Sequence, residues 1–233
     1  MTLPAPAVEA SDLRFAYSDG AGREVLRLTR LVIPAGERVF LHGPSGSGKT
    51  TLLGLIAGVL QPTGGRIAVL GRDLASIPSG ERDAFRGVHI GYLFQLFNLI
   101  PYLSVAENIA LPCRLHRARA ARLQGESIDA ATRRLAASLG LNGYLETAVT
   151  ALSVGQQQRV AAARALIGSP ELVIADEPTS ALDTDRRDDF LELLFRQCSD
   201  AGSTLLFVSH DLGLGARFDR QLALRELNQA EEV

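Results

Sequence analysis

The sequence lacks the features that mark secreted and membrane-spanning proteins. It contains no tryptophan, one methionine and two cysteines, and Cys113 and Cys198 are too few and too far apart to form a disulfide framework. No apolar run approaches the roughly 20 residues that a membrane-spanning helix requires. The first residues also lack the charged and apolar regions of a signal peptide. We therefore expect a cytosolic protein that only a partner holds at a membrane.

An excess of charge of either sign is also missing. The 24 Lys and Arg residues nearly balance the 26 Asp and Glu residues, which leaves a formal net charge of −2. Nucleic-acid-binding proteins usually carry a basic field, so no nucleic-acid partner is expected. With 233 residues, 46% of them hydrophobic, the chain can bury one large core, or one core with an inserted subdomain.

Lysine is nearly absent, because Lys49 is the only lysine among the 24 basic residues. It lies in the run Gly43–Thr50, which reads Gly-Pro-Ser-Gly-Ser-Gly-Lys-Thr between an apolar strand-like segment and a helix-like segment. This context is typical of a phosphate-binding P-loop, whose backbone N–H groups surround an anion at a helix N-terminus. Lys49 would reach the β- and γ-phosphates, and the hydroxyl of Thr50 would hold Mg²⁺.

A second acidic signal follows the apolar segment 172–175, where Asp176 and Glu177 are adjacent. Strand ends of α/β sheets are where ligands bind, and a carboxylate there can hold a magnesium ion that bridges phosphates. Asp176 fits that role, and Glu177 could polarise an attacking water as a general base. Taken alone, such an acid pair could equally be a helix N-cap.

The segment Leu152-Ser153-Val154-Gly155-Gln156 has the pattern of a capping box. It predicts a helix that runs to Ile167 and ends at Gly168. A helix start with a serine hydroxyl and a glycine N–H can bind an anion. On these five residues alone, an ordinary helix cap is the better interpretation.

Short alternating runs fill the first third of the chain. The segments 13–17, 25–33, 39–41 and 66–70 read as strands, and residues 1–11 read as a loose lead-in. From about Gln95 the sequence becomes apolar and proline-interrupted, and residues 114–139 then show helical spacing with Gly140 as a cap. Within that stretch the basic cluster of Arg114, Arg117, Arg119 and Arg122 is expected to form a solvated helix face.

The predicted fold class is therefore α/β. It comprises a P-loop NTPase (RecA-like) core with an N-terminal antiparallel β-subdomain, from residues 1–94 and 168–233, and an inserted α-helical subdomain over residues 95–167. Buried parallel strands are expected at 172–175 and 204–208.

Taken together, these motifs resemble the ATPase subunit of the ATP-binding cassette (ABC) transporters over nearly the whole chain. The resemblance implies that Tyr17 stacks on adenine, Gln95 is the Q-loop glutamine that senses Mg²⁺ and the γ-phosphate, and His210 is the switch histidine. It makes Leu152–Gln156 the signature, Asp176 and Glu177 the Walker B pair, and 180–183 the D-loop. The resemblance implies that the catalytic residues are Glu177, His210, Lys49 and Gln95. It implies that Mg²⁺ is bound by Thr50, Gln95 and Asp176. The residues implied to bind ATP are Tyr17, Gly43, Pro44, Ser45, Gly46, Ser47, Gly48, Lys49, Thr50, Thr51, Ser153, Gly155 and Gln156.

The resemblance also implies partners. A second copy would close on ATP through Ser153 and Gly155, although Val154 replaces the usual first signature glycine. An integral-membrane permease would dock near Gln95–Pro112, at the cytoplasmic face of the inner membrane. The segment 99–112 looks like the corresponding segment of lipoprotein-releasing and macrolide-export ATPases.

Three other classes of P-loop protein are alternatives to a transporter ATPase. A non-transporting regulator similar to the cell-division ABC ATPase would have the same motifs. Clamp ATPases of DNA repair carry long insertions that this chain lacks. A soluble P-loop kinase would leave the signature segment and His210 unexplained.

Overall fold

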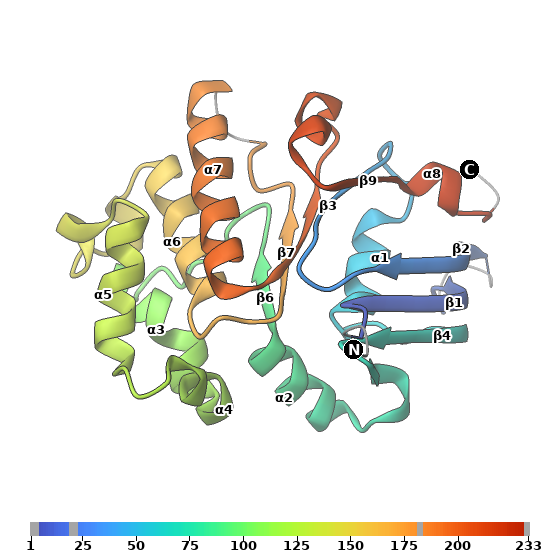
Figure 1. Cartoon of the computed structure of the whole chain (residues 1–233), viewed down its shortest axis with the longest axis horizontal. Helices are drawn as coiled ribbons and strands as arrows, with labels where there is room; N and C mark the ends of the chain where they lie inside the picture. The colour runs from blue at the N-terminus through green and yellow to red at the C-terminus, as the bar shows by residue number, and fades with distance from the viewer. Residues whose placement is uncertain (1–4, 19–22, 181–183, 231–233) are drawn as a thin grey trace. The chain divides into compact units, whose positions relative to one another are not determined.

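The computed structural model describes residues 5–18, 23–180 and 184–230, which divide into two compact units (Figure 1). The first unit comprises Met1–Arg86 and Thr204–Val233, and the second comprises Gly87–Ser203. The segment 95–167, predicted to be a helical subdomain, lies inside the second unit. Residues 181–183 of the expected D-loop lie outside the described residues.

The first unit contains the predicted antiparallel sheet, in the order β2-β1-β4-β5. Its strands are β1 (Val8–Ala16), β2 (Glu24–Ile33), β4 (Gly64–Val69) and β5 (Arg72–Asp73). Strand β1 begins before the predicted start, so the expectation of a loose lead-in through residue 11 is wrong for Val8–Ser11. The reason is burial, because Val8 and Ala10 point into the core while Glu9 and Ser11 stay exposed.

An irregularity keeps β1 amphipathic along its whole length. Asp12 has a left-handed backbone with φ 47, and the pairing with β4 shifts register between Ser11 and Arg14. Because side chains alternate with a period of two, the shift lets Leu13 and Phe15 return to the buried face. A Cβ atom on Gly65 would collide with the Asp12 carbonyl, so the close approach of β4 requires glycine there.

The first unit also contains parallel strands, in the order β8-β3-β9. They are β3 (Arg38–His42), β8 (Thr204–Val208) and β9 (Arg220–Ala223). All five residues of β8 are buried, and the rings of Phe40, Phe207 and Phe218 pack with centroids 5.2–6.4 Å apart. The helices of this unit are α1 (Lys49–Ile56), α8 (Leu224–Leu227), the 3-10 turns Leu74–Ser76 and Leu212–Arg217, and most of α2 (Ser79–His89).

The second unit pairs β6 (Ile90–Leu93) with β7 (Leu172–Asp176) in parallel. Its helices are α3 (Val105–Leu115), α4 (Arg117–Ala120), α5 (Ile128–Ser138), α6 (Val154–Leu166) and α7 (Thr184–Ala201), with 3-10 turns at Ala121–Leu123, Asn142–Tyr144 and Val149–Ala151. Helix α3 packs against both α5 and α6. The helix ends predicted at Gly58, Gly140 and Gly168 are confirmed, since all three glycines have positive φ.

Two expectations about the helical segment are wrong. Pro112 does not interrupt the helix but lies inside α3, and residues 114–139 contain the end of α3, α4, a 3-10 turn and α5 rather than one helix. No helix within the described residues is long and apolar enough to cross a membrane.

The basic cluster is not a uniformly solvated face, because Arg119 is only 2% exposed. Its guanidinium donates to the carbonyls of Ile167 at 2.8 Å and Ala165 at 2.6 Å, near the end of α6. It also donates to the carbonyls of Gly87 at 3.1 Å and Ile90 at 3.0 Å. Arg119 therefore joins three segments of the second unit through their backbones.

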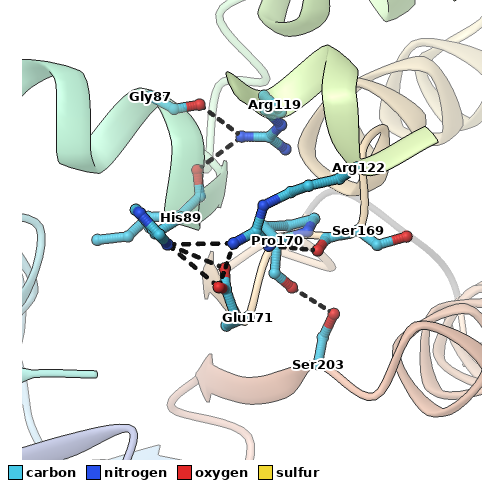
Figure 2. A network of polar contacts seen from close by, with 9 residues as sticks. Gly87, His89, Arg119, Arg122, Ser169, Pro170, Glu171 and Ser203 are labelled. Atoms are coloured by element: carbon cyan, nitrogen blue, oxygen red, sulfur yellow. Dashed lines mark hydrogen bonds and ion pairs between the residues drawn. The ribbon is translucent and has the colours of Figure 1, made fainter. Parts of the chain in front are cut away.

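Arg122 belongs to the same cluster and forms an ion pair with Glu171 (Figure 2). His89 Nδ1 lies 3.1 Å from the same carboxylate. Within the cluster, Arg114 and Arg117 are exposed as predicted, whereas Arg119 and Arg122 hold the second unit together.

Candidate nucleotide-binding site

The predicted P-loop connects β3 to α1 in the first unit, as the sequence indicates. Gly46 and Gly48 have left-handed backbones with φ 81 and φ 94. A Cβ atom on Gly48 would also lie 2.8 Å from the Leu26 side chain. Both conformation and space therefore require glycine at position 48. Gly48 is the N-cap of α1, so the start of this helix has no capping side chain.

The Lys49 ammonium folds back over the loop. Its Nζ donates to the carbonyl oxygen of Gly43 at 2.7 Å and to that of Pro44 at 2.9 Å. Peptide carbonyls are neutral acceptors, so an anionic phosphate oxygen would compete well for the same ammonium. With the helix N-terminus of α1 beside it, the loop is suited to bind a phosphate group.

Tyr17 is held beside the same helix. Its hydroxyl shares a hydrogen bond of 3.1 Å with Thr51 Oγ1, and its ring packs edge-on against Phe15. The ring remains 42% exposed. The first unit thus brings Tyr17 close to α1, and the exposed ring face can stack on a planar base.

A pocket of about 480 Å³ adjoins the P-loop. Pro44, Ser45, Gly46 and Ser47 line one side of it. The remaining lining residues are Arg23, Glu24, Val25, Arg225, Asn228 and Ala230, none of which the sequence analysis predicted. Sequence carried no signal for the last three, because they lie far along the chain from the P-loop and only the fold brings them to it.

His210 follows β8, the strand that pairs in parallel with β3. The N–H of its neighbour Ser209 donates to the Leu41 carbonyl at 3.2 Å, just before the P-loop begins. The carboxyl ends of both strands therefore meet at one edge, where His210 is exposed. The structure places this predicted residue at the P-loop edge of the first unit.

The second unit gathers the other predicted catalytic residues at one strand edge. Leu93 pairs with Ala175, so Gln95 and the acidic pair leave β6 and β7 in the same direction. Tyr92 makes a side-chain hydrogen bond to Asp176. Burial first, and then the charge and hydrogen bond of Asp176, hold the pKa of Tyr92 well above its usual range. Glu177 has a left-handed backbone with φ 47, which L side chains seldom adopt.

The capping box predicted at the signature segment is confirmed. Ser153 is the N-cap of α6, where its Oγ accepts from Gln156 N at 3.4 Å and its own N–H donates to Gln156 Oε1 at 2.9 Å. Val154 is the first helical residue and is 51% exposed. Ser153 is exposed too, and Gly155 follows in the same turn.

Helix α6 also reaches the other two motifs of its unit, through residues that the sequence analysis did not identify. Buried Gln158 donates to the Pro178 carbonyl at 2.9 Å, one residue after Glu177. Arg164 donates to the carbonyls of Phe97 at 2.6 Å and Asn98 at 2.7 Å, just after Gln95. The signature helix is therefore bonded to the segments that follow Gln95 and Glu177.

The donors are suitable for magnesium, although the described residues contain no group of three His, Cys, Asp or Glu side chains that could hold a metal. Magnesium in nucleotide sites keeps several waters and takes one or two protein oxygens together with phosphate oxygens. Thr50 in the first unit carries a hydroxyl oxygen and Asp176 in the second a carboxylate, and both are the kinds of oxygen ligand that magnesium takes.

Comparison with known proteins agrees with these motifs. Residues 26–180 match the ABC transporter family. The chain is 43% identical to the lipoprotein-releasing system ATP-binding protein LolD of Anaeromyxobacter dehalogenans, over 94% of this chain and 90% of that protein. It is 41% identical to the macrolide export ATP-binding/permease protein MacB of Rhodopirellula baltica, over 90% of this chain and 30% of that protein. The resemblance predicted from sequence is thus confirmed.

The fold class is confirmed as well. The structure superposes on a dimeric post-hydrolysis state of the ATP-binding cassette MJ0796 bound to ADP and Pi with a TM-score of 0.83. That comparison has 32% identity and covers 97% of both chains. The chain therefore belongs to the ABC transporter family, as one of its ATP-hydrolysing subunits.

Proposed function

We propose that the chain binds magnesium-ATP between two of its copies and uses hydrolysis to drive an integral-membrane permease. The observation that carries this proposal is the Lys49 ammonium resting on the Gly43 and Pro44 carbonyls at the N-terminus of α1. A phosphate group entering the loop would replace those neutral acceptors with charged ones. The triphosphate would then lie on the backbone N–H groups of the P-loop.

Chemistry at the γ-phosphate would be shared among five side chains. Bound Mg²⁺ would neutralise charge on the phosphates, held by Thr50 and Asp176 with Gln95 as a further contact. Glu177 would orient and polarise the attacking water, and its left-handed backbone is the kind of strained conformation found at catalytic positions. His210 would contact the γ-phosphate as the water attacks.

The second copy would supply the missing wall of each ATP site. Ser153 Oγ accepts one bond within its capping box, which leaves the hydroxyl proton to donate to a phosphate oxygen. Val154 points its side chain towards solvent at the helix start, so we propose that Ser153 and Gly155 still close on the nucleotide. The dimeric, ADP- and Pi-bound state of MJ0796 supports such a clamp.

The permease would dock on the loop after Gln95. A groove of about 340 Å³ is present there, lined by Leu96, Phe97, Asn98, Leu99, Pro101, Val149, Thr150 and Gln157. Leu96 and Tyr102 are each 83% exposed, which is unusual for side chains so apolar. Docking at this groove would place the chain at the cytoplasmic face of the inner membrane.

The names of the relatives indicate the kind of work done. Proteins named for lipoprotein release and macrolide export match over most of this chain. We propose that the permease acts on a substrate at its periplasmic side. A complex that hydrolyses ATP and moves no cargo would instead resemble the cell-division regulator.

The ATP clamp is tested with Glu177→Gln, which removes the base and keeps the shape. We expect ATP turnover to fall by on the order of 1,000-fold, and the ATP-loaded variant to elute as a dimer in size exclusion. A double variant that also carries Lys49→Ala is the control and should stay monomeric. A Glu177→Gln protein that remains monomeric with ATP, or that hydrolyses ATP as fast as wild type, would refute the clamp.

The docking site is tested by co-purification from detergent extracts. Tyr102→Glu should release the membrane partner while basal ATP hydrolysis by the purified subunit is unchanged. Leu115→Glu is the matched control, since Leu115 is also exposed but lies outside the proposed docking segment Gln95–Pro112. Equal retention of the partner by both variants would exclude this surface.

A further inference from the structure

One side chain near the end of the described chain reaches the P-loop. Asn228 Oδ1 accepts from the Arg27 N–H at 2.8 Å, and its Nδ2 donates to the Val25 carbonyl at 3.0 Å. The same Nδ2 donates to the Ser47 carbonyl at 3.3 Å. Its backbone N–H ends α8 by bonding to Leu224 O at 2.8 Å. Asn228 therefore connects α8, β2 and the P-loop.

The contact with Ser47 bears on the phosphate-binding groups. A trans peptide is planar, so the carbonyl of Ser47 and the N–H of Gly48 point in opposite directions. Holding the carbonyl at Asn228 therefore sets the direction of the Gly48 N–H. Gly48 is the N-cap of α1 and has the freedom of a left-handed glycine, so this peptide plane needs an external restraint.

The segment around Asn228 also forms part of the pocket beside the loop. Arg225, Asn228 and Ala230 line the same cavity of about 480 Å³ as Ser45 and Ser47. Arg225 brings positive charge to that wall. A ligand in this pocket would therefore contact both the P-loop and the segment 225–230.

We propose that Asn228 is a positioning residue for the phosphate loop, and that the segment 225–230 is a wall of the nucleotide pocket. Nucleotide binding and the attachment of this segment to β2 then stabilise each other, since each favours the same orientation of the Ser47–Gly48 peptide. This inference rests on the proposed nucleotide site at the P-loop.

A purely structural role for the segment makes a different prediction, and Gln229 allows the two to be separated. Gln229 N donates to the Arg27 carbonyl at 2.8 Å, and its Oε1 accepts from Thr29 Oγ1 at 3.3 Å. Its side chain thus bonds to β2 but not to the P-loop. Gln229→Ala should loosen the segment without disturbing the peptide plane at Gly48.

The experiment titrates fluorescent ADP with magnesium into wild type, Asn228→Ala, Asn228→Asp and Gln229→Ala. Losing the Ser47 restraint should weaken binding by about five- to tenfold in Asn228→Ala. Asn228→Asp should be weaker still, because a carboxylate cannot donate to Ser47 and adds negative charge beside the phosphates. Gln229→Ala should bind within about twofold of wild type, as expected for a surface change.

Two further readouts decide the interpretation. Hydrogen exchange in 224–230 should slow when ADP binds to wild type, and this slowing should shrink in Asn228→Ala. Melting temperatures identify any variant that fails to fold, in which case Asn228→Ser supplies the affinity measurement. Unchanged affinity in folded Asn228→Ala, or equal losses in Asn228→Ala and Gln229→Ala, would overturn the proposal. Lys49→Ala tests the site itself: if it binds ADP like wild type, the proposed nucleotide site is wrong instead.

Discussion

Lys49 and Arg119 are both bonded to backbone carbonyls, yet their surroundings give them different roles. Lys49 in the first unit donates to two carbonyls of its own loop, at the edge of an open pocket. Arg119 in the second unit donates to four carbonyls, in the stretches 87–90 and 165–167, and is almost fully buried. An ammonium on a flexible stem can exchange one acceptor for another, whereas a buried planar guanidinium with four acceptors cannot.

Burial also changes the acidity of Arg119. It lowers the pKa of the guanidinium to about 10, with the charge of Arg122 acting in the same direction and Cys113 and Glu171 opposing it. The group still carries its charge at neutral pH. A buried charge is tolerable only when it is well hydrogen-bonded, and the four carbonyls meet that condition. Hydrogen bonds from a cation to carbonyls can thus be exchanged for bonds to a ligand at Lys49, whereas at Arg119 they hold segments of the fold together.

The largest effect is expected from Lys49→Ala. ATP turnover should fall on the order of 100- to 1,000-fold, because the variant lacks the ammonium that would neutralise charge on the phosphates. The free energy of unfolding should change by less than about 1 kcal/mol, since only the two hydrogen bonds from the ammonium to the loop carbonyls are lost. Turnover and urea denaturation measure the two quantities. A variant that hydrolyses ATP normally but unfolds easily would show that Lys49 has a structural role like that of Arg119.

The second-largest effect is expected from Arg119→Met, which fills similar space without a donor. The free energy of unfolding should fall by about 3 kcal/mol or more, because buried carbonyls lose their partner. Urea denaturation provides the measurement. Arg117→Met is the matched control, since Arg117 is exposed two residues away, and it should change stability by less than about 0.5 kcal/mol. Equal stability of the two variants would show that the four bonds are unimportant.

A smaller effect is expected from Arg119→Lys. The ammonium keeps the charge but has three donors and no planar fork, so it cannot reproduce four bonds to separate carbonyls. We expect a loss of about 1–2 kcal/mol, between wild type and Arg119→Met. Urea midpoints of the three proteins should follow that order. A Lys variant as stable as wild type would mean that charge alone is sufficient at this position.

The smallest effect concerns the pH dependence of the ion pair next to Arg119. Burial alone raises the pKa of Glu171, but the hydrogen bond from Arg122, its own backbone N–H and His89 outweigh it, so the pKa is lowered overall. A carboxyl with a lowered pKa in the folded state stabilises above its unfolded pKa of about 4.3 and loses that contribution as pH falls below it. Glu171→Gln should flatten the fall in urea midpoint between about pH 5 and pH 3. An unchanged slope would contradict the assignment.

Much of the site could be predicted because its determinants are close together in the chain. The P-loop glycines act within eight residues, between a strand and a helix that the apolar pattern already indicates. The capping box of Ser153 and Gln156 spans one helical turn. Gly58, Gly140 and Gly168 end helices through their own backbone conformation. In each case the residue type and a short spacing carry the information.

Other features depend on residues that the sequence does not place together. Arg117 and Arg119 look alike in the chain, but only Arg119 finds carbonyls, and those of Ala165 and Ile167 lie 46 and 48 residues away. Asn228 reaches a P-loop carbonyl 181 residues away. The early start of β1 likewise follows from which side chains the finished sheet buries.

The sequence by itself therefore determined the phosphate loop, the helix caps and the family, because local backbone geometry and motif spacing specify them. Tertiary structure alone decided which arginine is buried, which asparagine restrains the loop and which residues wall the pocket. A hydrogen bond between distant segments depends on where the packed core places a donor and an acceptor, and that position is a property of the whole fold.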